Sequence, residues 1–380
     1  MTTYLVWIGV IYFLLILAMR SSRLEYVYGV DQEQYLPNKF FVFFIFVVLS
    51  GLYTFRWCNG TDFFNYYMDF YSSRNDNFSY VLEQRDILFS FVTYITKNYI
   101  SDNFLIYNAI LAICTYVPII AVMRKYSSDF KITMLLYIFS TAYFKPYNTV
   151  RQGIAVSIMF YAFPFLIERR YKKFLFYTLV ASLFHPTAAI TAIIMFFCLG
   201  DFLSKQVKIF LAVFAASGIG LKSIWNSVIG MLDSIGQTKM ASDYADALTG
   251  ITGINIFHVL VVAVPVILCL VYKNVLLYLE DEIEYEFISF YMNSLLFFLG
   301  FVLIGMYNPI FARMGQFFEL YLLLLYPRLI EKIGAEKKRT LAFFVLTAYF
   351  VYFLVVLPRG GSYVPYQFNH YSIEGIVMQP

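Results

Sequence analysis

The chain has 380 residues, of which 61% are hydrophobic and only 14% are charged. A soluble domain carries about 25% charged residues, so this composition excludes a large water-soluble catalytic domain and indicates an integral membrane protein. The net charge of +4 gives no reason to expect a nucleic-acid partner, because the basic residues fall mostly in short loops between apolar runs. The four cysteines match no metal-binding spacing, and no metal site is expected.

Apolar runs follow one another along the whole chain. A membrane-spanning helix needs about 20 mostly apolar residues, and the sequence offers eleven or twelve such runs. We therefore predict an all-α, polytopic integral membrane protein. No internal repeat and no low-complexity linker divides the chain, so residues 1–380 are expected to form a single transmembrane domain. The expected spans are 4–19, 40–55, 102–123, 130–146, 150–167, 172–185, 186–200, 208–224, 254–272, 286–306, 314–330 and 340–357.

The number of spans depends on how residues 172–200 are interpreted. Pro186 lacks a helix hydrogen-bond donor and disfavours continuation of a helix, which favours two short segments broken at His185-Pro186. A single long helix with a kink is the alternative. That alternative would reverse the orientation of everything before or after it.

Lys and Arg residues indicate which side of the membrane each loop faces. Eighteen of the 28 lie in loops on one side, which the positive-inside rule assigns to the cytoplasm. Both termini then face outward. Three longer segments also face outward: residues 56–101, with a surface helix expected over 86–97, residues 225–253, and the tail 358–380.

The first outward polar cluster follows the second expected span. Gly60 predicts a turn, and Thr61 or Asp62 is a candidate cap for the helix that follows. Helical spacing then places Asp62, Tyr66 and Asp69 on one face. A plain helix cap is one interpretation of these residues. A carboxylate held near a sugar hydroxyl is the other.

The second cluster is the polar turn 145–149 together with the helix start that follows it. The first turn of that helix carries Arg151 and Gln152. An arginine at the outer end of a spanning helix often anchors to lipid head groups. Its planar fork of donors also suits a phosphate. The helix N-terminus and Gln152 favour the anion-binding interpretation here.

The third cluster is built around His185, which lies between two apolar runs. A histidine at a helix break is often only a satisfied polar residue. A neutral imidazole is equally the usual general base for removing a proton from a hydroxyl. Both interpretations stay open.

The fourth cluster lies where the chain re-enters the membrane before its penultimate span. Arg313, Gln316 and Glu319 occupy one helical face there. Together with the outward helix ends that carry Arg56 and Arg151, Arg313 suggests a multi-arginine site for a doubly charged phosphate. This hypothesis requires the three arginines to face one region of the helix bundle.

The order of these residues resembles the EpsG family of bacterial exopolysaccharide proteins, which is related to the Wzy-type polymerases of lipid-linked repeat units. The resemblance covers residues 50–330. The chain departs from the family pattern at His185-Pro186-Thr187, where a His-x-Ser pattern would be commoner, and at Phe317-Phe318, where a Tyr-Phe pair would be expected. The matching residues are Arg56, Gly60, Thr61, Asp62, Tyr66, Glu83, Asn148, Arg151, Gln152, Ala155, Leu183, Phe184, His185, Thr187 and Arg313.

The resemblance implies a multi-helix membrane glycosyltransferase of GT-C-like architecture, acting on the outer face of the bacterial cytoplasmic membrane. Such an enzyme transfers a growing glycan from polyprenyl diphosphate to the terminal hydroxyl of the next lipid-linked repeat, during exopolysaccharide, capsule or O-antigen synthesis. The expected donor and acceptor are both polyprenyl-diphosphate-linked oligosaccharides. Membrane lipids, a chain-length regulator and a flippase are further candidate partners. No cofactor is expected.

The resemblance also distributes roles among the polar clusters. The arginines would stabilise the leaving diphosphate in place of a metal ion. His185 is the first candidate for the base that activates the acceptor hydroxyl, with Asp62 or Glu83 second. The residues expected to bind diphosphate are Arg151, Arg313 and Arg56, and those expected to bind substrate are Gln152, Asn148, Tyr66, Tyr147 and Gln316.

Three other functions fit part of the pattern. A transporter or flippase of lipid-linked sugars would have similar helices and arginines, but should show repeat symmetry and charges at mid-membrane. A membrane O-acyltransferase would use His185 to activate a sugar hydroxyl toward an acyl donor. That function gives no clear role to the three arginines. A structural subunit of an export complex would be inactive with defined lipid substrate.

Overall fold

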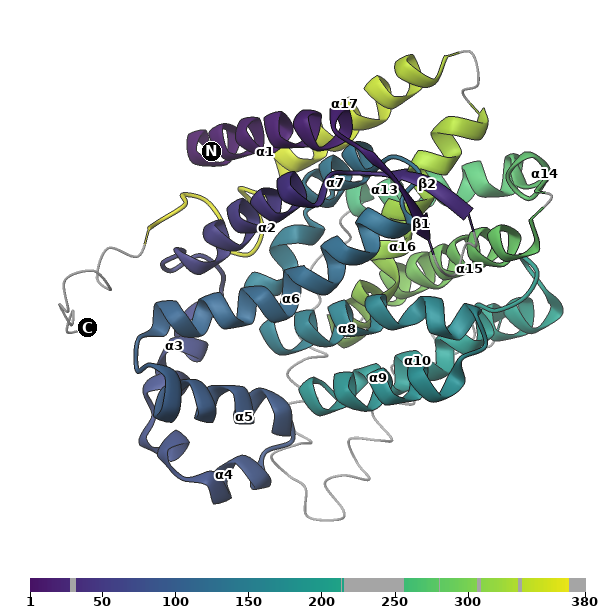
Figure 1. Cartoon of the computed structure of the whole chain (residues 1–380). Helices are drawn as coiled ribbons and strands as arrows, with labels where there is room; N and C mark the ends of the chain where they lie inside the picture. The colour runs from purple at the N-terminus through teal and green to yellow at the C-terminus, as the bar shows by residue number, and fades with distance from the viewer. Residues whose placement is uncertain are drawn as a thin grey trace. The chain divides into compact units, whose positions relative to one another are not determined.

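The computed structural model describes residues 1–27, 32–212, 214, 256–279, 281–305, 309–333 and 337–368 (Figure 1). Most of these residues are helical, which confirms the prediction of an all-α polytopic membrane protein. By internal contacts the chain forms two compact units, Met1–Ala192 with Gly334–Pro380, and Ile193–Ile333. The single transmembrane domain stays a prediction, and the expected outward loop 225–253 lies outside the described residues.

The described helices follow the expected spans closely, with the exception of 208–224, most of which lies outside the described residues. Five of them are long and apolar enough to cross a membrane: α1 (Thr2–Arg20), α6 (Phe104–Tyr126), α8 (Val150–Ile167), α15 (Glu282–Gly305) and α17 (Lys338–Val356). The shorter helices are α2 (Lys39–Thr54), α7 (Phe130–Phe139), α9 (Tyr171–Phe184), α10 (Thr187–Phe197) and α13 (Ile256–Val271). The remaining long helix is α16 (Pro309–Ile333).

In the first unit, α8 packs between α6 and α9, and α2 packs against both α1 and α6 (Figure 1). The rings of Tyr126 and Phe163, near the C-terminal ends of α6 and α8, lie 5.6 Å apart. These two helices therefore run in the same direction. The turn at residues 168–170 reverses the chain, so α9 runs antiparallel to α8.

A short β-hairpin interrupts the helices at one end of this unit. Strand β1 (Arg23–Val27) pairs antiparallel with β2 (Gln32–Leu36), in a register that puts Arg23 opposite Leu36. The sequence analysis did not anticipate this element, because the segment is too polar to span a membrane and too short to show a clear period. Its position is fixed by an ion pair between Glu25 on β1 and Arg124 near the end of α6.

The helical conformation is interrupted at His185, as the two-segment interpretation predicts. Helix α9 ends at Phe184, and His185 has an extended backbone with φ −156° and ψ 120°. The residue before a proline is pushed out of the helical region by the proline ring. Helix α10 starts at Thr187, directly after Pro186. The helix is therefore interrupted at His185-Pro186, while the crossing of the membrane by two separate segments stays a prediction.

Residues 56–101, which were expected to face outward, fold into short helices. They are α3 (Phe63–Tyr71), the 3₁₀ turn η1 (Ser73–Asp76), α4 (Phe78–Glu83), α5 (Ile87–Ile95) and the π-helical turn η2 (Thr96–Ile100). Helix α5 lies within the range 86–97 that was expected to be helical, and its place on the membrane surface stays a prediction. Asn77 starts α4 by accepting a hydrogen bond from Ser79 N at 3.0 Å.

Basic residues and the polar clusters lie at opposite ends of the first unit. Arg20 ends α1, Lys39 begins α2 and Arg124 lies in the last turn of α6. Their common end is tied together where Asn38 N donates to Ala18 O at 3.1 Å. Arg151 lies at the other end, in the first turn of α8. The two groups of loops are therefore separated as predicted, while the side of the membrane that each faces stays a prediction.

The second unit is built on the antiparallel pair α15 and α16, with α13 and α14 (Lys273–Leu276) packed beside it. The pair is held at one end by Arg328, which forms an ion pair with Glu284 at 2.7 Å. The buried amide of Asn293 donates to Cys198 O at 3.1 Å and to Asp201 O at 3.3 Å. These bonds tie the loop after α10 to the middle of α15.

Gly60 is required where the loop after α2 meets the turn before α8. Its φ is +109°, and an added Cβ would lie 2.7 Å from Asn148 Oδ1 and 2.9 Å from Tyr147 O. We expect Gly60→Ala to lower the Tm of the detergent-purified protein, because strain of this kind costs about 1–3 kcal/mol.

Gly51→Ala in α2 is the matched control. No described atom lies within 4 Å of the position that its Cβ would take, and alanine is the better helix former. Its Tm should be unchanged or slightly higher. Equal Tm values for the two variants would contradict the proposed constraint at Gly60.

Candidate functional site

The start of α8 is set by the turn that precedes it. The 3₁₀ turn η3 (Ala142–Tyr147) ends at Tyr147, and α8 begins at Val150. Gly153 allows the first turn of α8 to lie close to this segment, since an added Cβ would be 2.9 Å from Pro146 Cβ. The close approach of η3 to α8 therefore depends on a small residue at position 153.

Arg151 is the most prominent charged residue at this helix start. It forms an ion pair with Asp86, in which the Arg151 Nη1 to Asp86 Oδ2 distance is 2.9 Å. The guanidinium carbon lies 4.9 Å from the ring centre of Phe89 and 5.9 Å from that of Tyr66. The side chain of Arg151 is still 39% exposed. The guanidinium is therefore held in place while part of it stays accessible to a ligand.

Asp86 belongs to the segment between α4 and α5. It occupies the N-cap position of α5, yet within the described structure its side chain makes no capping hydrogen bond. That carboxylate is 11% exposed and is directed to Arg151 instead. Its second oxygen, Oδ1, is buried without a hydrogen-bond partner among the described residues. The pairing joins the outward segment to the first turn of α8.

Tyr66 and Asp69 on α3 face the same arginine. Burial raises the pKa of Tyr66, while Arg151 and the backbone N–H groups of Arg151 and Val150 oppose that rise. The tyrosine hydroxyl therefore lies at the positive end of α8. Burial also raises the pKa of Asp69, against the opposing effect of Arg151 and Arg74. A carboxyl group with a raised pKa beside a cation is a candidate acid or base.

Arg56 has a different environment from Arg151. Its side chain is buried, with 1% of the residue exposed. The guanidinium carbon lies 4.0 Å from the ring centre of Tyr53 and 4.6 Å from that of Tyr147, and Nη1 donates to Tyr147 O at 3.0 Å. In this conformation Arg56 supports the fold and is not presented to a diphosphate. The expected three-arginine site thus has at most two accessible members in this conformation.

Asn148 and Tyr147 are also engaged within the fold. Asn148 Oδ1 accepts a hydrogen bond from Thr61 N at 2.7 Å, and its Nδ2 donates to Tyr363 Oη at 3.0 Å. Tyr147 is fully buried. Both residues were expected to contact substrate. Their contacts instead position the loop around Gly60 and the tail around Tyr363 against the start of α8.

The described part of the C-terminal tail, residues 358–368, returns to this end of the first unit. Asn59 Nδ2 donates to Tyr363 O and to Pro365 O, both at 2.9 Å, and Asn59 Oδ1 accepts from Gln367 N at 2.9 Å. Tyr4 Oη donates to Tyr363 O at 2.6 Å. The tail therefore fixes the loop before α3 and the beginning of α1.

The remaining candidates differ in exposure. Asp62 is half-buried before α3 and accepts a hydrogen bond from the Thr61 hydroxyl at 3.3 Å. Glu83 is exposed at the end of α4. Gln152 is 3% exposed beside Arg151. Asp62 and Glu83 are accessible to a ligand, whereas the side chain of Gln152 is buried beneath the surface.

His185 lies toward the same end of the first unit as Arg151. Helix α9 runs back along α8 and also contacts α5. It has 14 residues against 18 for α8, so it ends about 6 Å short of the start of α8 at 1.5 Å per residue. His185 is half-buried, and its Nδ1 lies 2.7 Å from the hydroxyl of Thr187. This contact fixes the orientation of the ring.

Arg313 and Gln316 belong to the second unit, in the first two turns of α16. Arg313 is exposed, Gln316 is half-buried and Glu319 is 4% exposed. Their spacing of three residues puts them on one face, as expected. A site shared between these residues and Arg151 stays a prediction.

Asp86 and Tyr363 were not assigned a role from the sequence. Asp86 could have been noticed as the first residue of the expected surface helix, where an acidic N-cap is usual. Asp69 was placed on the same face as Tyr66 but was given no function. Tyr363 carries no local signal, because its contacts with Asn148 and Tyr4 span more than two hundred residues of sequence.

The model of the EpsG family matches residues 39–368, which include α2 through the described part of the tail. No curated protein and no solved structure matches the chain.

Asp69 provides a test of the electrostatics at this site. Because burial raises its pKa, the folded protein holds this proton at a pH where the unfolded chain has released it. The contribution of Asp69 to the free energy of unfolding is therefore greatest below the pKa of about 3.9 that an aspartate has in the unfolded chain. It falls as the pH rises through the pKa of Asp69 in the folded protein. Asp69→Asn resembles the protonated form, so we expect a higher Tm than wild type at pH 7 and a difference that disappears near pH 4.

Asp102→Asn, at an exposed position between η2 and α6, is the control for a general charge effect. It should leave the pH dependence of Tm unchanged. A Tm of Asp69→Asn below that of wild type at pH 7 would show that ionised Asp69 stabilises the fold, contrary to expectation.

Proposed function

The chain belongs to the EpsG family of exopolysaccharide and Wzy-like polymerases, and on this premise we propose that it joins polyprenyl-diphosphate-linked oligosaccharides into a polysaccharide. The observation that carries the proposal is the accessible cation at the start of α8. Arg151 is anchored by Asp86 and flanked by aromatic rings, yet 39% of its side chain is exposed. This arrangement suits the diphosphate of a lipid-linked glycan donor.

The leaving group of this reaction is a lipid diphosphate, whose negative charge must be stabilised as the glycosidic bond breaks. Arg151 Nε has no hydrogen-bond partner among the described residues. The hydroxyl of Tyr66 lies at the positive N-terminal end of the same helix. Arginine and helix end together supply charge that other enzymes take from a metal ion, so we propose a metal-independent transfer. Arg313 and Gln316 would complete the diphosphate site.

The acceptor hydroxyl needs a base, and His185 is our first candidate. With Nδ1 engaged by the Thr187 hydroxyl, Nε2 is the nitrogen that would take the proton. The acceptor oxygen would then attack the anomeric carbon. The bond from that carbon to the diphosphate oxygen breaks, and polyprenyl diphosphate leaves. Asp62 and Glu83 are the second candidates, and the raised pKa of Asp69 adds it to this group.

We place the reaction on the outer face of the bacterial cytoplasmic membrane. The support is the separation of basic loops from the polar clusters at the two ends of the first unit, combined with the positive-inside rule. The product would enter exopolysaccharide, capsule or O-antigen. A chain-length regulator and a flippase that delivers the lipid-linked repeat are the proposed partners.

Polymer formation by purified protein tests the assignment. With the cognate lipid-linked repeat as substrate, Arg151→Ala and Arg313→Ala should each reduce the rate by about 10²-fold or more, since charge stabilisation of a leaving group has that magnitude. His185→Ala should reduce it by about 10²–10⁴-fold. The readout is labelled polymer separated by gel electrophoresis.

Arg85→Ala is the matched control, because Arg85 is exposed next to Asp86. It should retain activity, and all variants should keep the wild-type Tm within a few degrees. Wild-type protein should also make polymer in the presence of a chelator. Normal polymer from the three site variants would contradict the site, and loss of polymer in chelator would contradict a metal-independent reaction.

Membrane sidedness is tested by labelling single cysteines in a cysteine-free background. The exposed positions Arg85 and Lys172 lie at opposite ends of the first unit. We expect Arg85→Cys to react with a membrane-impermeant maleimide when the outer face is presented, and Lys172→Cys to react only after permeabilisation. The reverse pattern would place the proposed site in the cytoplasm.

A further inference from the structure

A groove of about 520 Å³ lies at the basic end of the first unit, away from the start of α8. Residues of the β-hairpin, of α2 and of α6 line it. Its volume falls within the range of about 300–1,000 Å³ that is usual for ligand sites. The groove uses none of the residues assigned to glycosyl transfer.

The walls of the groove are apolar. Val42 and Phe46 contribute from α2, while Val117, Ile120 and Ala121 contribute from α6. Helix α6 is long and apolar enough to span a membrane. Val117 on its wall is 44% exposed, so the groove is open along the surface that faces lipid in a spanning helix. An acyl chain matches these walls in chemistry.

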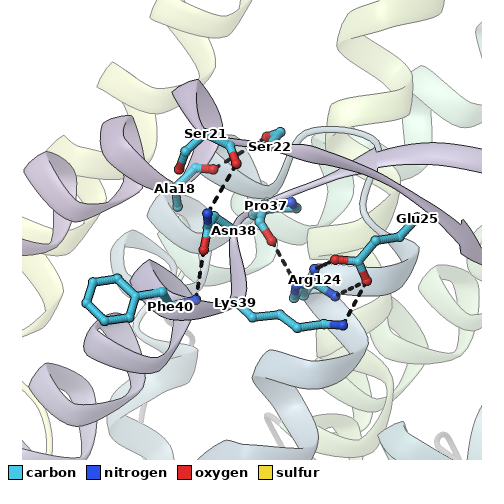
Figure 2. Close-up of polar contacts among 9 residues, drawn as sticks. All are labelled: Ala18, Ser21, Ser22, Glu25, Pro37, Asn38, Lys39, Phe40 and Arg124. Carbon is cyan, nitrogen blue, oxygen red and sulfur yellow. Dashed lines mark hydrogen bonds and ion pairs between the residues drawn. The ribbon is translucent and has the colours of Figure 1, made fainter.

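The mouth of the groove is charged (Figure 2). Arg124 binds both oxygens of Glu25, and its Nε donates to Pro37 O at 2.9 Å. Lys39 Nζ lies 3.1 Å from Glu25 Oε2, yet 74% of its side chain is exposed. Lys125 is the third basic residue of the lining. Among the described residues the lining contributes three cations and one carboxylate, and Lys125 also interacts electrostatically with Glu168 outside the lining. The described lining itself therefore carries a net positive charge.

The mouth is held rigidly enough to act as a preformed site. Asn38 Oδ1 caps α2 by accepting from Phe40 N at 2.9 Å, and Asn38 Nδ2 donates to Ser21 O at 3.4 Å (Figure 2). These contacts fix the start of α2 against the end of α1. Lys39 follows Asn38 directly, so its backbone position is fixed while 74% of its side chain is exposed.

We propose that this groove binds one anionic phospholipid. Its phosphate would lie between Lys39 and Lys125, and one acyl chain would run along Val42, Phe46 and Val117. Basic pockets between spanning helices on the cytoplasmic side are suited to anionic head groups, because each nearby Lys or Arg attracts the charge of the head group. A neutral phospholipid would fit the walls equally well but would gain less at the mouth.

The test is native mass spectrometry of the delipidated protein, titrated with phosphatidylglycerol or phosphatidylcholine of identical acyl chains. We expect at least fivefold tighter binding of phosphatidylglycerol. The double variant Lys39→Ala/Lys125→Ala should lose this preference, whereas Lys172→Ala, which removes a charge at the same end outside the groove, should keep it.

A second pair of variants tests the apolar walls. Ala121→Trp would fill the groove and should abolish tight binding, while Ile113→Trp, at an exposed position elsewhere on α6, should not. Inorganic phosphate should fail to displace the lipid, because it lacks the acyl chain. Three results would each overturn the proposal. The first is equal affinity for the two lipids, and the second is unchanged lipid binding by Ala121→Trp. The third is tighter binding of polyprenyl phosphate than of phosphatidylglycerol, seen as displacement of bound phosphatidylglycerol.

Discussion

A buried guanidinium determines how the polar end of the first unit is assembled. Arg56 is nearly excluded from solvent, and its compensation comes from two tyrosine rings and the carbonyl of Tyr147. A charge at such a position is costly without partners, so those partners must stay in place. Tyr147 ends η3 only three residues before α8 begins. Holding its carbonyl therefore fixes where α8 starts and where its first side chains lie.

The two arginines at this end illustrate how one residue type serves two purposes. Arg56 is enclosed by aromatic rings and backbone, whereas Arg151 has a buried carboxylate on one side and solvent on the other. Both lie where an apolar helix meets a polar turn, Arg56 just after its helix and Arg151 in the first turn of its own. The difference lies in what surrounds each guanidinium: Tyr53 and Tyr147 enclose that of Arg56, whereas that of Arg151 meets Asp86 and solvent. Contacts between residues distant in sequence thus separate the structural arginine from the accessible one.

Local sequence signals predicted the helices well. Apolar runs located the spans, and Pro186 located the break that leaves His185 extended. The hairpin at Arg23–Leu36 was missed, because its stability depends on the ion pair between Glu25 and Arg124 at the end of a distant helix. The polar clusters were recognised from residue types, but Asp86 acquires its role only by meeting Arg151. The burial of Arg56 and Tyr147 likewise could not be predicted from the residue types, since arginine and tyrosine are both common at membrane interfaces.

The carboxylate of Asp86 also has a kinetic consequence. A diphosphate that binds the exposed side of Arg151 lies near a carboxylate that is already in place, 2.9 Å from Nη1. Repulsion between the two anions reduces the net affinity for the ligand, while the ion pair with Asp86 keeps Arg151 in position. Tight retention of a spent lipid diphosphate would slow turnover, since product release often limits the rate of an enzyme. In the proposed reaction, Asp86 therefore favours release of the leaving group.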